Sequence, residues 1–188
     1  LGDVTKWREW AIDWGSIDLL MGGSPCQGFS FAGKQLAFDD PRSALFFTYV
    51  DILNHIKALN PAVKFLMENV RMKKQYLDVI TEHLNTDPIM INSALVSAQN
   101  RVRFYWTDIG AIKQPMDKGT VLNNIIDKRV DLSFYHTDKA IAYMERGNAK
   151  WMQAGSRRAD RYLQHVGKEK AFTLTANFYK GVPYNYFM

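Results

Sequence analysis

The chain contains a single cysteine, Cys26, in a setting that favours a nucleophile. It lies in the small-residue segment 22–30, directly after the apolar run 17–21. A short apolar run followed by glycine and proline predicts a buried strand that ends in a loop, and a thiol in a loop is exposed enough to react. A lone cysteine is also a common filler of protein cores. Other polar residues must therefore decide between these two interpretations.

Two more groups of reactive side chains follow predicted strands. Glu68 comes after the apolar run 63–67, and Arg101 and Arg103 alternate at the spacing of one strand face. Because ligands of an open parallel sheet bind at the carboxyl ends of its strands, the thiol, the carboxyl group and the guanidinium groups are expected to converge on one edge. Each group has a structural alternative. Glu68 can be a solvated acid at a strand end, and the arginines can mark an exposed edge that discourages aggregation.

The apolar pattern of the first 110 residues alternates between strands and helices. Strands are predicted at 17–21, 63–67, 88–95 and 102–106, and helices at 45–59 and 76–84. The βαβαβ alternation indicates an α/β fold with a parallel sheet and right-handed crossovers. A short polar turn separates the last two strands, which indicates an antiparallel hairpin at one edge of the sheet.

Beyond about residue 112 the periodicity weakens, and aromatic, basic and turn residues mix. We therefore predict two domains, residues 1–112 and residues 113–188, of which the second is small, irregular and β-rich. Residues 1–110 carry 11 Lys/Arg and 12 Asp/Glu, whereas residues 111–188 carry 13 and 7. This basic excess favours a polyanion such as nucleic acid as the partner of the second domain, although solvated faces alone also produce surplus lysines.

The composition limits the class of protein. With 188 residues, 47% of them hydrophobic, the chain is long enough for one full-sized core. One cysteine excludes an internal disulfide, fits a reducing compartment and argues against a structural zinc site. We find neither an apolar run long enough to span a membrane nor a signal peptide. The sequence therefore predicts a cytoplasmic protein without a metal or a membrane partner.

Taken together, the motifs resemble those of the DNA cytosine-5 methyltransferase family. Segment 22–30 is similar to the catalytic loop of that family, Glu68-Asn69-Val70 to its Glu-Asn-Val motif, and Gln99-x-Arg101-x-Arg103 to its Gln-x-Arg-x-Arg motif. The opening segment 2–4 resembles its short Gly-Asp-Ile segment. The likeness covers residues 1 to about 110 in the order of the family. It implies an α/β fold with a Rossmann-like sheet of the S-adenosylmethionine-dependent methyltransferases.

The resemblance also implies a reaction, the transfer of a methyl group from S-adenosylmethionine to C5 of a flipped cytosine in double-stranded DNA. Cys26 would add to C6 of the base, and Glu68 would protonate N3. Arg101 and Arg103 would bind the base carbonyl and a flanking phosphate. The matching cofactor-binding positions are Asp3, Val4, Pro25 and Leu45. The matching DNA-binding positions of the catalytic loop are Gln27, Ser30, Lys34 and Arg42. Composition adds three basic DNA-binding candidates from the second domain, Arg157, Arg158 and Lys180.

The sequence also departs from the family pattern. It lacks the glycine-rich cofactor loop that precedes the Gly-Asp segment, and it stops before the final Asn-containing helix of the family. We therefore expect a fragment with an incomplete sheet that is inactive alone, or one half of a split enzyme that a complementing chain completes. Two other functions stay open, a non-catalytic DNA-binding relative and an RNA cytosine-5 methyltransferase. The motifs do not disclose a recognition sequence or a role in restriction-modification, protection or regulation.

Overall fold

The computed structural model describes residues 1–25, 45–153 and 169–173, and the chain divides into two compact units. The first unit comprises Leu1–Ile91 and Val102–Gln114, and the second comprises Asn92–Arg101 and Pro115–Met188. Residues 92–101 thus group with the second unit, although the sequence pattern placed them in the first. The assignment of catalysis to one part and of DNA recognition to the other stays a prediction.

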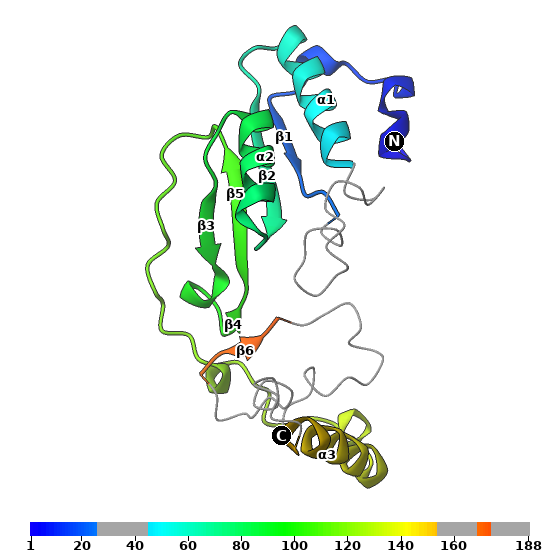
Figure 1. Ribbon diagram of the computed structural model, residues 1–188, viewed down its shortest axis with the longest axis vertical. Helices are drawn as coiled ribbons and strands as arrows, with labels where there is room; N and C mark the ends of the chain where they lie inside the picture. The colour runs from blue at the N-terminus through cyan, green and yellow to red at the C-terminus, as the bar shows by residue number, and fades with distance from the viewer. Residues whose placement is uncertain (26–44, 154–168, 174–188) are drawn as a thin grey trace. The chain divides into compact units, whose positions relative to one another are not determined.

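The first unit is built on a four-stranded sheet in the order β1-β2-β5-β3 (Figure 1). Its strands are β1 (Leu19–Gly22), β2 (Lys64–Val70), β5 (Val102–Thr107) and β3 (Ile89–Asn92). β1 and β2 run parallel, but β5 runs antiparallel to β2. The predicted α/β class and the parallel pairing of β1 with β2 are confirmed. An antiparallel pair was expected only within an edge hairpin of β3 and β5, whereas β5 also pairs antiparallel with β2, which makes the sheet mixed. β3 and β5 are neighbours, and β3 lies at the sheet edge.

Two helices connect the strands, as the apolar spacing predicted. Helix α1 (Leu45–Leu59) buries one face, with Phe46 and Ile56 fully enclosed, and α2 (Lys74–Leu84) buries Ile80 and Leu84. The rings of Phe46 and His83 lie 5.8 Å apart, so α1 and α2 are in contact. Because proline disfavours a helical residue before it, α1 ends ahead of the Asn60-Pro61 pair.

Asn60 and the N-terminal segment hold β1 against α1. The Asn60 side-chain amide donates a hydrogen bond to the Ile17 carbonyl at 3.0 Å, just before the strand. Two short 3-10 helices, η1 (Val4–Glu9) and η2 (Trp14–Ser16), precede β1. The buried Trp7 ring lies 5.4 Å from the ring of Trp14 and 5.1 Å from that of His55 on α1. These aromatic contacts fix the N-terminal segment on the helix.

The burial of β1 differs from the prediction. Leu19 and Met21 are 46% and 62% exposed, so the apolar run is not covered on both faces by the described residues. β1 lies at the end of the sheet and pairs with β2 on one side. The core instead centres on the middle strands and the helices. Its largest fully buried side chains are Trp106, Phe46, Phe65, Leu53, Ile56, Met67 and Ile80.

In its described part, the second unit is helical and irregular rather than β-rich. It contains α3 (Asp138–Gln153), the 3-10 helices η4 (Ser93–Leu95), η5 (Leu122–Asn124) and η6 (Leu132–Phe134), and a parallel pair of short strands, β4 (Gln99–Asn100) and β6 (Ala171–Phe172). The strand predicted at 88–95 stops at Asn92, whose side-chain Oδ1 accepts hydrogen bonds from the backbone N–H groups of Ala94 and Arg101. Across the ranges that the structure describes, no helix is long and apolar enough to cross a membrane.

Candidate active site

The carboxyl ends of β1 and β2 lie side by side, and the β1 end leads towards Cys26. The parallel register pairs Gly22 with Met67. Continued by one residue, this register brings Gly23 beside Glu68. The spacing is tight, because a Cβ atom placed on Gly23 would lie 3.2 Å from Glu68 Oε2 and 3.3 Å from the Glu68 carbonyl oxygen. The glycine therefore lets the backbone pass directly beside the carboxylate.

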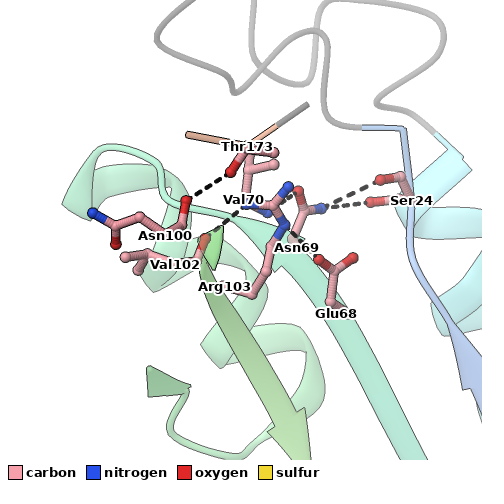
Figure 2. Close-up of polar contacts among 8 residues, drawn as sticks. All are labelled: Ser24, Glu68, Asn69, Val70, Asn100, Val102, Arg103 and Thr173. Atoms are coloured by element: carbon pink, nitrogen blue, oxygen red, sulfur yellow. Dashed lines mark hydrogen bonds and ion pairs between the residues drawn. The ribbon is translucent and has the colours of Figure 1, made fainter. Parts of the chain in front are cut away.

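Hydrogen bonds between Asn69 and Ser24 fix the start of the segment that follows β1. The Asn69 side chain is 1% exposed, and its amide donates to Ser24 Oγ at 3.0 Å and to the Ser24 carbonyl at 3.5 Å (Figure 2). Its Oδ1 accepts the backbone N–H of Val70 at 2.8 Å. A buried amide that is satisfied in this way anchors the chain one residue before Pro25. Cys26 itself lies outside the described residues.

Strand β5 adds a cation to the same edge. In the antiparallel register Glu68 pairs with Tyr105, so Arg103 is its diagonal neighbour on the same face. Arg103 Nε lies 2.7 Å from Glu68 Oε1, and the two side chains are 14% and 34% exposed (Figure 2). The Nε–H group has no hydrogen-bond partner in the part of the chain described here, so the contact is an ion pair with poor hydrogen-bond direction. Arg103 holds one carboxylate oxygen while the other faces Gly23.

The second predicted arginine is placed differently. Arg101 lies between β4 and β5, outside both strands, so the expectation that Arg101 and Arg103 project from one side of a strand is wrong. Its backbone N–H donates to Asn92 Oδ1 at 3.0 Å, and its carbonyl accepts from Ser93 at 3.0 Å. Arg101 belongs to the second unit and Arg103 to the first. The local turn at Asn92 overrides the alternation that the spacing indicated.

A cavity of about 450 Å³ opens at the end of β1, entirely within the first unit. Three of the four predicted cofactor residues line it, Val4, Pro25 and Leu45, together with Trp10 and Tyr49. Apolar and aromatic walls at the carboxyl end of a strand, with backbone polar groups nearby, are typical of nucleoside-sized ligand sites. These residues therefore fit an adenosine-containing cofactor.

The fourth predicted cofactor residue, Asp3, does not line this cavity. Its Oδ1 accepts hydrogen bonds from the Thr5 backbone N–H at 2.9 Å and from Thr5 Oγ1 at 2.8 Å, which caps η1. These bonds lower the pKa of the Asp3 carboxyl group below its usual value. Both bonds use the same oxygen, so Oδ2 is left to accept from a ligand amino group. The adenine contact of Asp3 remains a prediction.

Several predicted site residues lie outside the described part of the chain. They are Cys26, Gln27, Ser30, Lys34, Arg42, Arg157, Arg158 and Lys180. One basic residue of the second unit that is described, Lys170, has a structural role: its ammonium group donates to the carbonyl oxygens of Ala94, Ser97 and Thr120 at 2.7, 3.2 and 2.6 Å. An ammonium group has three N–H donors. Lys170 therefore does not contribute to the basic surface that the composition indicated.

Sequence reasoning missed two supporting residues of the site. Asn69 was part of a matched motif, but no role followed from its position. A buried amide at the end of a strand is a signal that could have prompted a search for its partner, Ser24. Tyr49 lies within the helix predicted at 45–59, and no role followed from its position. Its hydroxyl donates to the Leu20 carbonyl at 3.3 Å, and its ring leaves no room for a side chain on Gly22, whose Cβ would lie 2.9 Å away.

Comparison with known proteins identifies relatives of this chain. The family model described as C-5 cytosine-specific DNA methylase matches residues 1–145. The type II methyltransferase M1.ScrFI of Lactococcus lactis subsp. cremoris is 32% identical over 95% of this chain and 50% of its own length. M.NlaIV of Neisseria lactamica is 36% identical over 62% of this chain and 30% of its own length. M.Eco47II of Escherichia coli is 50% identical over 37% of this chain and 14% of its own length.

The chain thus spans about half the length of M1.ScrFI. The family match runs through η1, both helices of the first unit and all four strands of its sheet, and it includes Glu68 and Arg103. The chain belongs to the C-5 cytosine-specific DNA methylase family.

Proposed function

We propose that the natural protein containing this chain transfers a methyl group from S-adenosylmethionine to C5 of cytosine in double-stranded DNA. One observation carries the proposal: Gly23, which directly follows β1 and precedes Cys26 in the sequence, lies beside Glu68, and Arg103 pairs with that carboxylate. An acid and a guanidinium group beside the segment that precedes a cysteine in the sequence have a common use in this family. A protein that only binds DNA has no need for a nucleophile beside a proton donor.

The chemistry explains each residue type. C5 of cytosine is a poor nucleophile, and the addition of the Cys26 thiolate to C6 moves electrons from the ring double bond towards N3. Glu68 supplies a proton to N3 as that charge develops, which leaves C5 nucleophilic. After C5 is methylated, it loses its proton to a solvent base, the S–C6 bond breaks and Cys26 leaves as a thiolate, and N3 returns its proton to Glu68. The C5–C6 double bond is restored and the Cys26 thiolate is regenerated, so the enzyme is ready for another turnover.

The cofactor site in this scheme is the cavity at the end of β1. Val4, Pro25 and Leu45 line that cavity, and Tyr49 forms part of its wall. S-adenosylmethionine bound there supplies the methyl group. Burial raises the pKa of the Tyr49 hydroxyl group, so the wall stays uncharged at neutral pH. Asp3, next to Val4, is the candidate acceptor for the adenine amino group.

Arg103 orients the acid in this scheme. Its guanidinium group holds Glu68 Oε1, which restricts rotation of the carboxylate before a base arrives. Arg101 is the candidate for the base carbonyl or a flanking phosphate.

DNA contacts of the proposed enzyme come from two regions. The target base must leave the stack, at a cost of a few kcal/mol. Gln27 and Ser30 of the catalytic loop, with Lys34 and Arg42, are candidates for the contacts that offset this cost. Arg157, Arg158 and Lys180 are candidates for phosphate contacts in the recognition region. Because M1.ScrFI and M.NlaIV are named type II methyltransferases, we propose a role in restriction-modification.

A mechanism-based trap tests the proposal. The natural full-length protein is incubated with S-adenosylmethionine and duplex DNA that carries 5-fluorocytosine, and denaturing electrophoresis follows. Fluorine at C5 blocks the final elimination, so a covalent complex should accumulate with the wild type and not with Cys26→Ser. A parallel reaction with single-stranded RNA that carries 5-fluorocytosine shows whether the protein forms the adduct with DNA or with RNA. An adduct that survives Cys26→Ser, or no adduct from a folded protein that binds DNA, contradicts the assignment.

A second variant addresses the acid. Glu68→Gln preserves the size of the side chain and removes the proton donor. We expect it to slow single-turnover methylation by about 10²-fold or more, within the range of general acid catalysis, while DNA affinity changes little. Equal losses in rate and affinity would indicate that Glu68 acts on structure or DNA binding instead.

A further inference from the structure

We propose that Gly23 is a positioning residue for Glu68, and this inference rests on the proposed methyl transfer. Gly23 directly follows β1, whose last residue pairs with Met67, and lies beside the Glu68 carboxylate. Its lack of a side chain sets where the carboxylate sits when a base enters. No other residue type leaves the same space.

The two oxygens of Glu68 face different neighbours. Oε1 lies 2.7 Å from Arg103 Nε, and Oε2 lies 3.2 Å from the position that a Cβ atom on Gly23 would occupy. A separation between 3.0 and 3.4 Å is tighter than most contacts of a real Cβ, so one partner must move by a few tenths of an ångström. The carboxylate cannot move freely towards Arg103, because that side is already at ion-pair distance. A methyl group at position 23 therefore rotates or lifts the carboxylate.

The contact itself, rather than the backbone conformation, requires glycine here. Among the described glycines, positive φ angles occur at Gly2, Gly110 and Gly119, and Gly23 is not one of them. An alanine at position 23 therefore meets no left-handed backbone penalty. The expected effect of Gly23→Ala is local to Glu68.

The neighbouring glycine serves a different contact. A Cβ atom on Gly22 would lie 2.9 Å from two ring carbons of Tyr49, a packing contact with α1 and the cofactor cavity. Gly22 thus separates β1 from the helix, whereas Gly23 separates the loop from the acid. Successive residues of an extended chain point to opposite sides, which explains the two contacts.

Displacement of the acid by a few tenths of an ångström should affect the chemical step more than binding. A misplacement of about 1 Å costs up to about 10²-fold in rate, so we expect Gly23→Ala to slow methylation by about tenfold. DNA affinity should stay within about twofold of the wild type, since neither Gly23 nor Glu68 carries the phosphate contacts of the proposal. The variant should therefore lower the methylation rate without a matching loss of DNA affinity.

The experiment is a double-mutant cycle in the natural full-length protein. Single-turnover methylation of duplex DNA and DNA affinity are measured for Gly23→Ala in the wild-type and Glu68→Gln backgrounds. The matched control is Gly15→Ala, whose nearest neighbour would lie at an ordinary 3.4 Å. We expect about tenfold slowing in the wild-type background and almost none in Glu68→Gln. The same loss in both backgrounds, or no more loss than in the control, overturns the inference.

A second readout separates this inference from the proposed function. If the wild type does not methylate DNA, the proposed function fails, and the contact is judged from urea unfolding. Gly23→Ala should then lower the unfolding midpoint more than Gly15→Ala does. Glu68→Ala, which removes the carboxylate, should reduce that shift. Strictly additive shifts would show that Gly23 does not act through the Glu68 side chain.

Discussion

The hydrogen bond between Asn69 and Ser24 should stabilise the fold measurably through one hydroxyl group. Ser24→Ala removes the acceptor that lies 3.0 Å from the Asn69 amide. The Ser24 carbonyl at 3.5 Å is the only other acceptor of that amide in the described chain, and it is at the limit of hydrogen-bond distance. The variant therefore leaves a buried donor nearly unsatisfied.

The expected loss follows from the burial of Asn69. A buried donor without a partner costs about 1–3 kcal/mol. Because Ser24 is half-buried and its carbonyl keeps a weak contact, the lower part of that range applies, about 1–2 kcal/mol. Asn69→Ala removes both bonds to Ser24 and the bond to the Val70 N–H, and should cost more.

Urea unfolding of the natural protein measures these effects, with the slope of the transition as a check on the unfolded state. The matched control is Ser16→Ala, which also removes one serine hydroxyl hydrogen bond, to the Asp13 carbonyl at 2.8 Å, at an exposed position. We expect the control to change stability by no more than about 0.5 kcal/mol. If Ser24→Ala matches the control, or if its effect adds fully to that of Asn69→Ala, the hydrogen bond does not hold the loop.

Three other predictions concern different parts of the chain. Gly22→Ala should destabilise the protein by about 1–3 kcal/mol because its Cβ overlaps the Tyr49 ring, and urea unfolding beside Gly15→Ala checks this; equal midpoints would contradict it. Lys170→Met should lower stability by about 1–3 kcal/mol because it strips a donor from three carbonyl groups, yet it should leave the salt dependence of DNA binding unchanged; a shallower salt slope would mean that Lys170 contacts phosphate. The pKa of Asp3 should lie below 3.8, since both Thr5 bonds favour the ionised form. Its contribution to stability is then present above pH 3.8 and is lost as pH falls through the folded-state pKa; carbon-detected NMR titration should show that pKa rising towards 3.8 in Thr5→Val.

The local elements of the first unit were predictable because each has a strong apolar pattern. The helix at 45–59 was predicted at its observed bounds, and all four sheet strands were predicted within a few residues. The order of the sheet was not predictable from pattern alone. The antiparallel place of β5 beside β2 depends on cross-strand pairing, such as that of Met67 with Trp106, which no local periodicity records.

The second unit shows the opposite balance. Helix α3 was not predicted, although its sequence carries an amphipathic pattern; of its described side chains, only Met144 is buried below a tenth exposure. The role of Lys170 was not predictable from the sequence either. The position of a lysine in a basic segment predicts an exposed charge, and only the tertiary structure shows that three carbonyl groups surround its ammonium group. Charge counts therefore overstate the DNA-binding surface wherever a cation satisfies backbone groups.

The Gln-x-Arg-x-Arg motif, from Gln99 to Arg103, contains residues of both units. Gln99 and Asn100 pair with Ala171 and Phe172 in the second unit, and the Thr173 hydroxyl donates to the Asn100 carbonyl at 2.8 Å. Arg103 pairs with β2 in the first unit and reaches Glu68. The motif therefore contributes residues to two separate ladders of hydrogen bonds, one in each unit.

The register of β5 sets the face of the sheet on which Arg103 lies, so the effect of a change in length depends on where the extra residue is accommodated. One glycine inserted between Asn100 and Val102 either shifts the register of β5 by one residue or is accommodated as a bulge at Arg101, outside both strands. A one-residue shift of β5 turns Arg103 to the opposite face of the sheet, away from Glu68. A bulge preserves the Glu68 pair and moves Arg101 alone. Methylation that falls as far as in Arg103→Ala would indicate the shift, and a smaller loss that matches Arg101→Ala would indicate the bulge. An insertion that leaves methylation unchanged would refute the argument, since neither arginine would then depend on the spacing of the motif.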